Sequence, residues 1–387
     1  MSRGQAQALE DRRGRPFDAA WREATEQIQA AALPEGRVTV SCSAPLGVGG
    51  LGRHLEEIVG ALAYAGERPA CICGTDRHRP PPHRRRSPRM LAATGLSRAL
   101  RALPVPLPYG MRMWAFVVEF DADAARRQPP GEHLIAFNGQ ALEQFRVAGR
   151  AGYESLELVS ANSHIRSLVR QHERAHRRYP LEGSWAAHLV RRNLAEYARA
   201  RRIYVGSRYV AESFLENGVA EERLASFPLT PDPRYRRRAA PPSSDSFEIV
   251  YIGRLAVHKG VPLLIDAVRR LPHADMRLTL IGGWATRGMR RFVEDACAAD
   301  GRISVSPGDP LPRLPDVSLC VHPAYEDGFA YAPAEALASG IPVIVSEDTG
   351  MKDLIDPPRT GLILPTGDID ALTAAIDAAY RREILVG

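Results

Sequence analysis

The chain has no long apolar run and nothing that resembles a secretory leader. Its 387 residues contain no stretch of 18 or more consecutive apolar side chains, which argues against a membrane-spanning helix. The first thirty residues carry acids and bases throughout and lack an apolar centre, so we expect no signal peptide. These absences favour a cytoplasmic protein, with any membrane contact limited to its surface.

Cysteine is also scarce, and its spacing argues against disulfide and metal frameworks. The five cysteines are odd in number and scattered along the chain, and the Cys71-Ile-Cys73 pair lacks metal-site spacing. We therefore expect free thiols in a reducing compartment and no bound metal or cofactor. The cysteines are Cys42, Cys71, Cys73, Cys297 and Cys320.

Positive charge is concentrated in two arginine-rich segments. The net charge is only +6, but arginines crowd the Pro-rich stretch 77–89 and the stretch 234–238. Such patches suit anionic lipid, an acidic acceptor or nucleic acid, and the alternative is a solvated loop and a solvated linker. No aromatic side chains interleave the first patch as a stacking platform for bases requires, so we expect no nucleic-acid partner.

The order of apolar segments predicts two α/β domains. Residues 1–36 are interpreted as an N-terminal extension whose helix packs on the body, with a membrane surface as the alternative, and the Pro/Ser-rich stretch 233–246 as a linker. Strand-like runs alternate with helical patterns over 37–232 and again over 247–387, which predicts two doubly wound parallel sheets facing across a cleft. The expected strands are 38–42, 70–73, 133–137, 156–159, 203–205, 249–252, 278–281, 303–305, 319–321 and 343–345.

The first group of candidate binding residues follows the strand 249–252. Gly253-Arg254 ends this strand, and Lys259-Gly260 precedes the next predicted helix. Two cations beside the end of a parallel strand suit a pyrophosphate, because each charge-assisted hydrogen bond contributes about 1.5–3 kcal/mol. Taken alone, the pair is more typical of two surface cations beside a loop.

The second group follows the strand 319–321. Asp327 and Glu335 are separated by a loop containing Gly328, and Pro333 suits the first turn of a helix. Free backbone amides at the start of that helix can meet an anionic or hydroxylated ligand, and the carboxylates can hold sugar hydroxyls. The simpler alternative is an acid that favours the helix dipole.

Several spaced motifs, in order, resemble the retaining glycosyltransferase family 4, which has the GT-B fold. They are Gly253-Arg254…Lys259-Gly260, Asp327-Gly-Phe…Glu335-Ala-Leu-Ala-Ser-Gly-Ile-Pro-Val-Ile, Thr349-Gly-Met-Lys-Asp-Leu-Ile, Gly361-Leu-Ile-Leu-Pro, Tyr204-Val-Gly-Ser-Arg-Tyr-Val…Phe214-Leu-Glu-Asn-Gly-Val and, more weakly, Gly49-Gly-Leu-Gly-Arg-His. The likeness covers most of residues 38–380. It implies metal-independent sugar transfer from a nucleotide-diphosphate sugar, in which the departing diphosphate helps to deprotonate the acceptor hydroxyl.

By this resemblance, Arg254 and Lys259 hold the donor diphosphate, with the helix-start residues Gly328, Phe329, Ala330 and Tyr331 beside the donor. Asp327 stands at the first acid of the family's E-x7-E motif and contacts the transferred sugar. Glu335 stands at the second acid and binds the ribose.

The first domain contributes three further expected site residues. Gly49 and Gly50 let the backbone approach the donor phosphate or the acceptor. His164 corresponds to a histidine that faces the sugar in many relatives, with a surface histidine at a helix start as the alternative.

The chain departs from the family pattern at three points. The first motif acid is Asp327 rather than Glu, and Ala330 stands where relatives have glycine, so donor choice and efficiency are open. The sequence ends at Gly387 without the long helix that usually crosses back onto the first domain, which leaves the coupling between domains open. These departures keep a second hypothesis, a catalytically inactive nucleotide-sugar binder of the same fold.

A third hypothesis is a nicotinamide-dependent oxidoreductase. The segment Gly47-Val-Gly-Gly-Leu-Gly52 matches G-x-G-x-x-G after a strand. However, Ser43-Ala-Pro-Leu separates the strand from the glycines, and the acid expected about 20 residues further on is absent, since Asp76 comes too late. The sequence leaves the donor nucleotide, the sugar and the acceptor undetermined.

Overall fold

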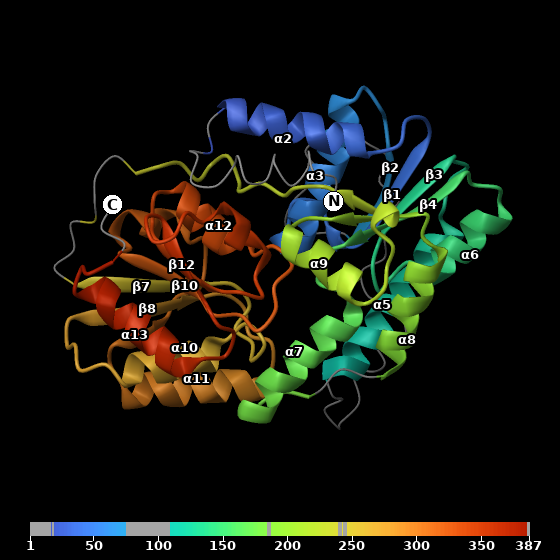
Figure 1. The fold of residues 1–387 in the computed structure, drawn as a ribbon. Helices are drawn as coiled ribbons and strands as arrows, with labels where there is room; N and C mark the ends of the chain where they lie inside the picture. Colours follow the sequence, from blue (N-terminus) through green and yellow to red (C-terminus); the bar gives the residue numbers. More distant parts are fainter. Residues whose placement is uncertain are drawn as a thin grey trace. The chain divides into compact units, whose positions relative to one another are not determined.

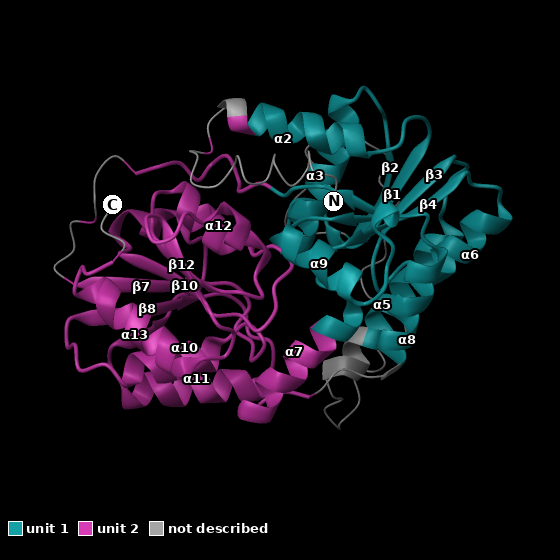
Figure 2. Cartoon of the chain, in the orientation of Figure 1, with its two compact units in different colours: residues 1, 22–167, 184–229 teal, residues 2–21, 168–183, 230–387 magenta. Residues whose placement is uncertain are grey.

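The computed structural model describes residues 17, 19–74, 109–183, 187–238, 242 and 246–384. The chain divides into two compact units (Figure 2), of which unit 1 holds residues 22–167 and 184–229 and unit 2 holds residues 2–21, 168–183 and 230–387. The Arg-rich stretch 77–89 lies outside the described residues. Within the described part, no helix combines the length and apolarity needed to cross a bilayer.

Unit 1 is built on a parallel sheet with the strand order β2-β1-β3-β4-β5-β6. Helices cover both faces of this sheet (Figure 1), as a parallel sheet requires. The strands are β1 (Val38–Pro45), β2 (Ala70–Gly74), β3 (His133–Phe137), β4 (Ser155–Ser160), β5 (Arg202–Val205) and β6 (Leu224–Ser226). The helices are α3 (Gly49–Tyr64), α5 (Tyr109–Arg126), α6 (Leu142–Arg150), α8 (Ala187–Arg199) and α9 (Arg208–Glu216), with the short η1 (Glu221–Arg223).

Unit 2 repeats the design with the strand order β12-β11-β10-β7-β8-β9. Its strands are β7 (Phe247–Ile252), β8 (Met276–Ile281), β9 (Ile303–Val305), β10 (Leu319–His322), β11 (Val343–Ser346) and β12 (Gly361–Leu364). Its helices are α10 (Val261–Arg269), α11 (Arg287–Ala299), α12 (Tyr331–Ala338) and α13 (Ile369–Tyr380), with the short η2 (Leu311–Asp316) and η3 (Gly350–Leu354). Helix α12 lies on one face of the sheet, and α10, α11 and α13 lie on the other (Figure 1).

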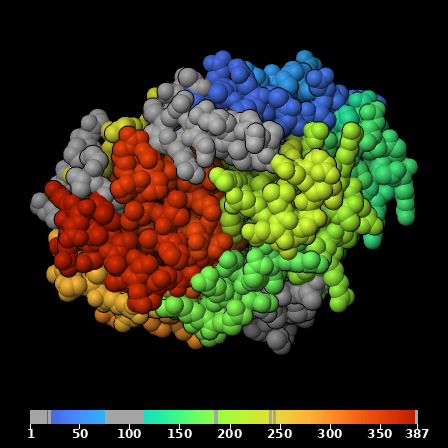
Figure 3. Space-filling model, in the orientation of Figure 1, coloured from blue at the N-terminus to red at the C-terminus, as the bar shows by residue number. Residues whose placement is uncertain are grey.

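The core of unit 2 lies between this sheet and the three helices on one face. Strand β7 is central, and its Ile249, Val250 and Tyr251 are each at most 1% exposed, because helices cover both of its faces. The C-terminal residues, red in Figure 3, form one continuous part of the face shown there. The carboxyl ends of the strands are thereby fixed by a well-packed core, and the loops that follow them have defined positions.

The predicted fold class, two doubly wound parallel α/β units, is confirmed, and most predicted strands fall within two residues of the observed ones. Sequence patterns missed α5, β6 and β12. The structure also places residues 168–183, which include most of α7 (Ile165–Arg178), in unit 2, whereas the sequence placed them in the first domain. All five cysteines are free thiols, as predicted.

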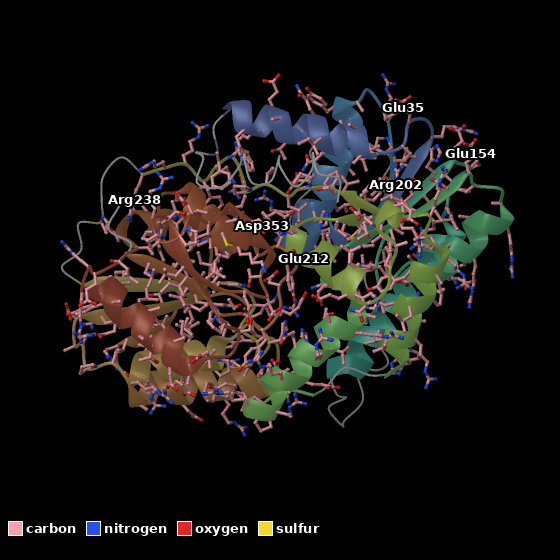
Figure 4. All side chains as sticks on the ribbon, viewed as in Figure 1. Glu35, Glu154, Arg202, Glu212, Arg238 and Asp353 are labelled. Carbon is pink, nitrogen blue, oxygen red and sulfur yellow. The ribbon has the colours of Figure 1, made fainter. Side chains whose placement is uncertain are left out.

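The N-terminal helix α2 (Ala19–Ala32) packs on unit 1, as the preferred interpretation of the extension predicts. Its Gln29 is buried and donates to the Pro228 carbonyl at 2.6 Å. Arg202, labelled in Figure 4, donates from β5 to the Ala32 carbonyl at the end of this helix, at 3.0 Å. The helix is therefore part of the body of unit 1.

Gly260 lies where the loop after β7 meets the loop after β10. Its φ is +73°, and a Cβ built on it would lie 2.0 Å from the Pro323 carbonyl oxygen. Both the left-handed backbone and the lack of space require glycine at this position. The close approach holds the two loops together.

Replacing this glycine is expected to destabilise unit 2. Gly260→Ala should lower the free energy of unfolding by at least about 2 kcal/mol, since left-handed strain adds to a backbone clash. The matched control is Gly301→Ala, where the added Cβ meets nothing within 4 Å and φ is not left-handed. Urea unfolding followed by circular dichroism measures both, and equal stabilities would contradict the proposed close packing.

Candidate functional site

The order of the strands in unit 2 marks one place for a ligand. The chain runs from β7 to β8 and β9 on one side, then crosses to β10, which pairs with the other edge of β7. Ligands of doubly wound sheets bind at such a switch point, beyond the carboxyl ends of the strands. The loops there are residues 253–260 after β7 and residues 323–330 after β10, the two segments singled out from the sequence.

Backbone contacts fix these two loops against each other. The Tyr325 amide donates to the His258 carbonyl at 2.8 Å, beside the close approach at Gly260. On its other side, the loop after β10 pairs with the segment after β11. The Asp327 amide donates to the Asp348 carbonyl at 3.1 Å, and the Gly350 amide donates to the Asp327 carbonyl at 2.9 Å. Asp327 is thus held by its backbone as well as by its side chain.

Lys259 and Asp327 form an ion pair at the switch point. Lys259 Nζ lies 2.8 Å from Asp327 Oδ2, and it also donates to the Glu326 carbonyl at 3.1 Å. The side chains of Lys259 and Asp327 are 16% and 19% exposed. Because the pair is largely removed from water, it interacts more strongly than a surface pair, and loss of one partner leaves a partly buried charge.

His322 at the end of β10 holds the same carboxylate. Its Nε2 lies 3.1 Å from Asp327 Oδ2, and the ring is 3% exposed and stacks on Tyr251 at a centroid distance of 5.6 Å. Burial alone would raise the pKa of the Asp327 carboxyl, but Lys259 and the His322 hydrogen bond together lower the pKa far below its usual range. Asp327 is therefore ionised, and Nε2 of His322 must carry the proton that it donates.

Arg254 follows β7 on the same edge of the sheet. Its side chain is exposed, and its carbonyl accepts a hydrogen bond from the Tyr251 hydroxyl at 2.9 Å. Tyr251 therefore fixes the backbone of Arg254 while its ring supports His322. The structure brings Arg254, Lys259 and Asp327 to one edge of unit 2, as the sequence predicted.

Helix α12 begins at this edge in a strained backbone. Its N-cap residue Ala330 has φ 68° and ψ 79°, a left-handed conformation that is costly for a residue with a Cβ. The Phe329 ring is buried, so only its backbone is available to a ligand. Gly328 and Tyr331 flank these two residues in the same turn, which brings the predicted helix-start residues together.

Glu335 lies one turn into α12, and its side chain is 9% exposed. Tyr235 lies near Glu335. Its burial is the main cause that raises the pKa of its hydroxyl, and the Glu335 carboxylate raises that pKa further. A ribose contact from this carboxylate stays a prediction, as does the sugar contact implied for Asp327.

Gly49 and Gly50 open helix α3 in unit 1 and are exposed. They follow β1, which pairs with β2 on one side and β3 on the other, so they lie at the switch point of the unit 1 sheet. Gly49 has φ +64°, and a Cβ added to it would meet nothing within 4 Å, so its left-handed backbone is what requires glycine. Their predicted approach to a donor or acceptor is not tested by this placement.

His164 is buried in the core of unit 1. Its ring packs against Tyr197 and Phe214, its amide donates to Ser213 Oγ at 2.8 Å, and its Nδ1 accepts from the Arg166 amide at 3.4 Å. The side chain is thus a packing residue and a cap at the start of α7. His164 is only 2% exposed, which argues against the surface alternative. The same burial does not favour the predicted sugar contact.

Two supporting residues, His322 and Tyr251, were missed by sequence reasoning. Both lie in strands, where their apolar neighbours suggested only core positions. The available signal was the place of His322 as the last residue of its strand, five positions before Asp327. A polar side chain that ends a parallel strand points to the ligand edge of the sheet.

A glycine substitution at Ala330 tests whether its left-handed backbone is strained. Ala330→Gly should raise the free energy of unfolding by about 0.5–1 kcal/mol, because the left-handed strain removed exceeds the added chain entropy. Ala298→Gly, the same change on an exposed position of right-handed helix α11, should lower it by about 1 kcal/mol. Chemical denaturation of the two variants compares them, and a fall in both would contradict the strained geometry.

The burial of His164 predicts a pH dependence of stability. Burial, aided by the nearby Arg166 charge, lowers the pKa of His164 from 6.5 to about 4. His164 has a lower pKa in the folded state than in the unfolded state. The stability of the folded state from a neutral His164 is therefore fully present above about pH 6.5 and is lost as the pH falls towards 4. His164→Phe should therefore reduce the loss of unfolding free energy between pH 7 and pH 5 by about 2 kcal/mol. Denaturation at both pH values measures this, and parallel losses would show that His164 is not held neutral.

Comparison with known proteins identifies relatives of the second half of the chain. Residues 234–385 match the family described as Glycosyl transferases group 1. A GDP-mannose-dependent alpha-mannosyltransferase of Mycolicibacterium smegmatis is 32% identical over 159 residues, which are 41% of this chain and 39% of that protein. The chain thus spans about two fifths of the length of the curated relatives it matches.

Solved structures show the fold over most of the chain. Sucrose-phosphate synthase from Thermosynechococcus elongatus superposes with a TM-score of 0.63 at 19% identity, covering 90% of each chain. The Anabaena protein HepE in complex with UDP-glucose gives a TM-score of 0.59 at 17% identity, covering 90% of this chain and 91% of HepE. The chain therefore has the GT-B fold, and its residues 234–385 match the glycosyl transferases group 1 family, which confirms the predicted resemblance to glycosyltransferase family 4 over this part.

Proposed function

We propose that the chain is a retaining, metal-independent glycosyltransferase that moves a sugar from a nucleotide-diphosphate sugar to an acceptor hydroxyl. The observation that carries the proposal is the grouping of Arg254, Lys259 and the start of α12 at the switch point of unit 2. Two cations and the backbone amides of a helix start on one sheet edge are the groups that a diphosphate needs. The family of residues 234–385 and the nucleotide sugar bound to HepE support this assignment.

In this proposal, Arg254 and Lys259 hold the diphosphate from the loop after β7. The exposed guanidinium of Arg254 can form two parallel bonds to phosphate oxygens. The amides at the start of α12 face the same negative charge with the positive end of the helix dipole. Glu335, one turn further on, accepts hydrogen bonds from the ribose hydroxyls.

The reaction needs no side-chain nucleophile. The bond between the anomeric carbon and the diphosphate oxygen breaks, and the acceptor oxygen bonds to the same face of that carbon. The acceptor proton passes to an oxygen of the departing diphosphate. Arg254, Lys259 and the helix-start amides contribute by stabilising the negative charge that develops on the leaving group.

The acceptor side is assigned to unit 1. Its switch point lies between β1 and β3, where Gly49 and Gly50 open α3 and where Gln140 Oε1 accepts from the Ser43 amide at 2.6 Å. The acceptor is a saccharide, a lipid-linked molecule or a small molecule. Peripheral contact of the Arg-rich stretch 77–89 with an anionic membrane belongs to the same proposal.

A ligand screen followed by a turnover assay tests the activity. UDP, GDP, ADP and dTDP, each with its sugars, are compared by thermal shift, and the best radiolabelled sugar nucleotide is then followed for hydrolysis or transfer. Turnover supports the enzyme. Saturable binding without turnover over a range of acceptors would instead indicate a catalytically inactive binder.

Two variants test the roles of the donor-site residues. Lys259→Met should weaken binding of both inorganic pyrophosphate and the best nucleoside diphosphate about tenfold, because one charge-assisted hydrogen bond is lost. Glu335→Ala should weaken binding of the nucleoside diphosphate about tenfold and leave pyrophosphate binding unchanged, because the ligand contact that it removes is to the ribose and not to the phosphates. Calorimetry measures both affinities.

Arg290→Met is the matched control. Arg290 is exposed on α11 and pairs with Glu294, so its loss changes the net charge as Lys259→Met does but away from the switch point. Its ligand affinities should stay within about twofold of the unmodified protein. Unchanged affinities in both Lys259→Met and Glu335→Ala would place the donor elsewhere.

A further inference from the structure

The Lys259 ammonium group is already strongly engaged by protein oxygens. Of its three N–H donors, one meets Asp327 Oδ2 at 2.8 Å and another meets the Glu326 carbonyl at 3.1 Å. Within the part of the chain that the structure describes, one donor is left for a phosphate oxygen. A diphosphate that reaches Lys259 therefore meets an ammonium group whose charge is balanced by a carboxylate.

Asp327 cannot move away easily from this position. Its amide and carbonyl are bonded to Asp348 and Gly350, and its Oδ2 accepts from both Lys259 and His322. His322 is itself fixed, because it ends β10 and stacks on the buried Tyr251. The carboxylate is thus held beside the diphosphate seat with its charge directed at Lys259.

We propose that Asp327 is a positioning and charge-balancing residue, which acts on the diphosphate through Lys259 and limits how tightly the nucleoside diphosphate is held. The inference rests on the proposed function and deepens it. A cation pair without a counter-charge would hold the diphosphate product more tightly and release it more slowly. Asp327 keeps Lys259 in place for the leaving group and weakens the hold on the product.

This role differs from a sugar contact in what a neutral substitution does. If the carboxylate bonds the sugar, its removal lowers the affinity for the sugar nucleotide and leaves the affinity for the nucleoside diphosphate unchanged. If the carboxylate balances Lys259, its removal raises the affinity for both ligands by a common factor, because the repulsion between the carboxylate and the diphosphate is lost. A gain in affinity also distinguishes this role from structural damage to the site, because damage would lower the affinity.

The test measures three dissociation constants for each variant by calorimetry. The probes are inorganic pyrophosphate, the nucleoside diphosphate that gives the largest thermal shift among UDP, GDP, ADP and dTDP, and the matching sugar nucleotide. Asp327→Asn should bind all three about tenfold more tightly, with the ratio between sugar nucleotide and nucleoside diphosphate unchanged. Asp327→Glu keeps the charge and should stay within about threefold of the unmodified protein.

Asp295→Asn is the matched control for net charge. Asp295 is exposed on α11, so the same substitution there should change each constant less than about twofold. Thermal melting of every variant confirms that it folds.

Each contrary outcome has a distinct meaning. If Asp327→Asn weakens only the sugar nucleotide, the carboxylate contacts the sugar, and the inference is wrong. If Asp327→Asn and Asp327→Glu weaken all ligands alike, or if neither changes any of them, the charge has no role, and the inference is also wrong. If Lys259→Met binds pyrophosphate as well as the unmodified protein does, the proposed donor site itself fails.

Discussion

The candidate site of unit 2 depends on the contact between two loops at the centre of its sheet. Gly260 approaches the Pro323 carbonyl too closely for any side chain, and the Tyr325 amide bonds to the His258 carbonyl beside it. These contacts place Lys259 of one loop 2.8 Å from Asp327 of the other. The positions of these two charged residues, which come from separate segments of the sequence, thus depend on backbone packing and not on the flexible lysine side chain alone.

The same junction explains why the site holds its charges in fixed positions. His322 and Tyr251 come from two neighbouring strands and support Asp327 and Arg254, respectively, through one stacked pair of rings. Because both rings are buried in the sheet, they give the charged groups a rigid base. In the proposed reaction, a site organised in this way would stabilise developing negative charge without rearranging.

The sequence was sufficient for the fold class and for bringing the two candidate loops of unit 2 together. Apolar strands alternating with amphipathic helices predicted both sheets, and the spacing of Lys259, Asp327 and Glu335 predicted which loops converge. Helix α5 follows a segment without a readable pattern, and β6 and β12 are short edge strands of three and four residues, so periodicity carried little signal for them. The prediction for His164 rested on the family resemblance, whereas its packing against Tyr197 and Phe214 depends on residues far along the chain that no local pattern reveals.

The docking of helix α2 bears on where this protein can be shortened. The Ala32 carbonyl accepts hydrogen bonds from Arg202 and Tyr204, and Gln29 bonds to the Pro228 carbonyl. A clone that started at residue 34 would leave the buried Tyr204 hydroxyl with one acceptor fewer and the Pro228 carbonyl without its glutamine donor. Recombinant versions should therefore begin upstream of Ala19, although the first strand of the unit 1 sheet starts only at Val38.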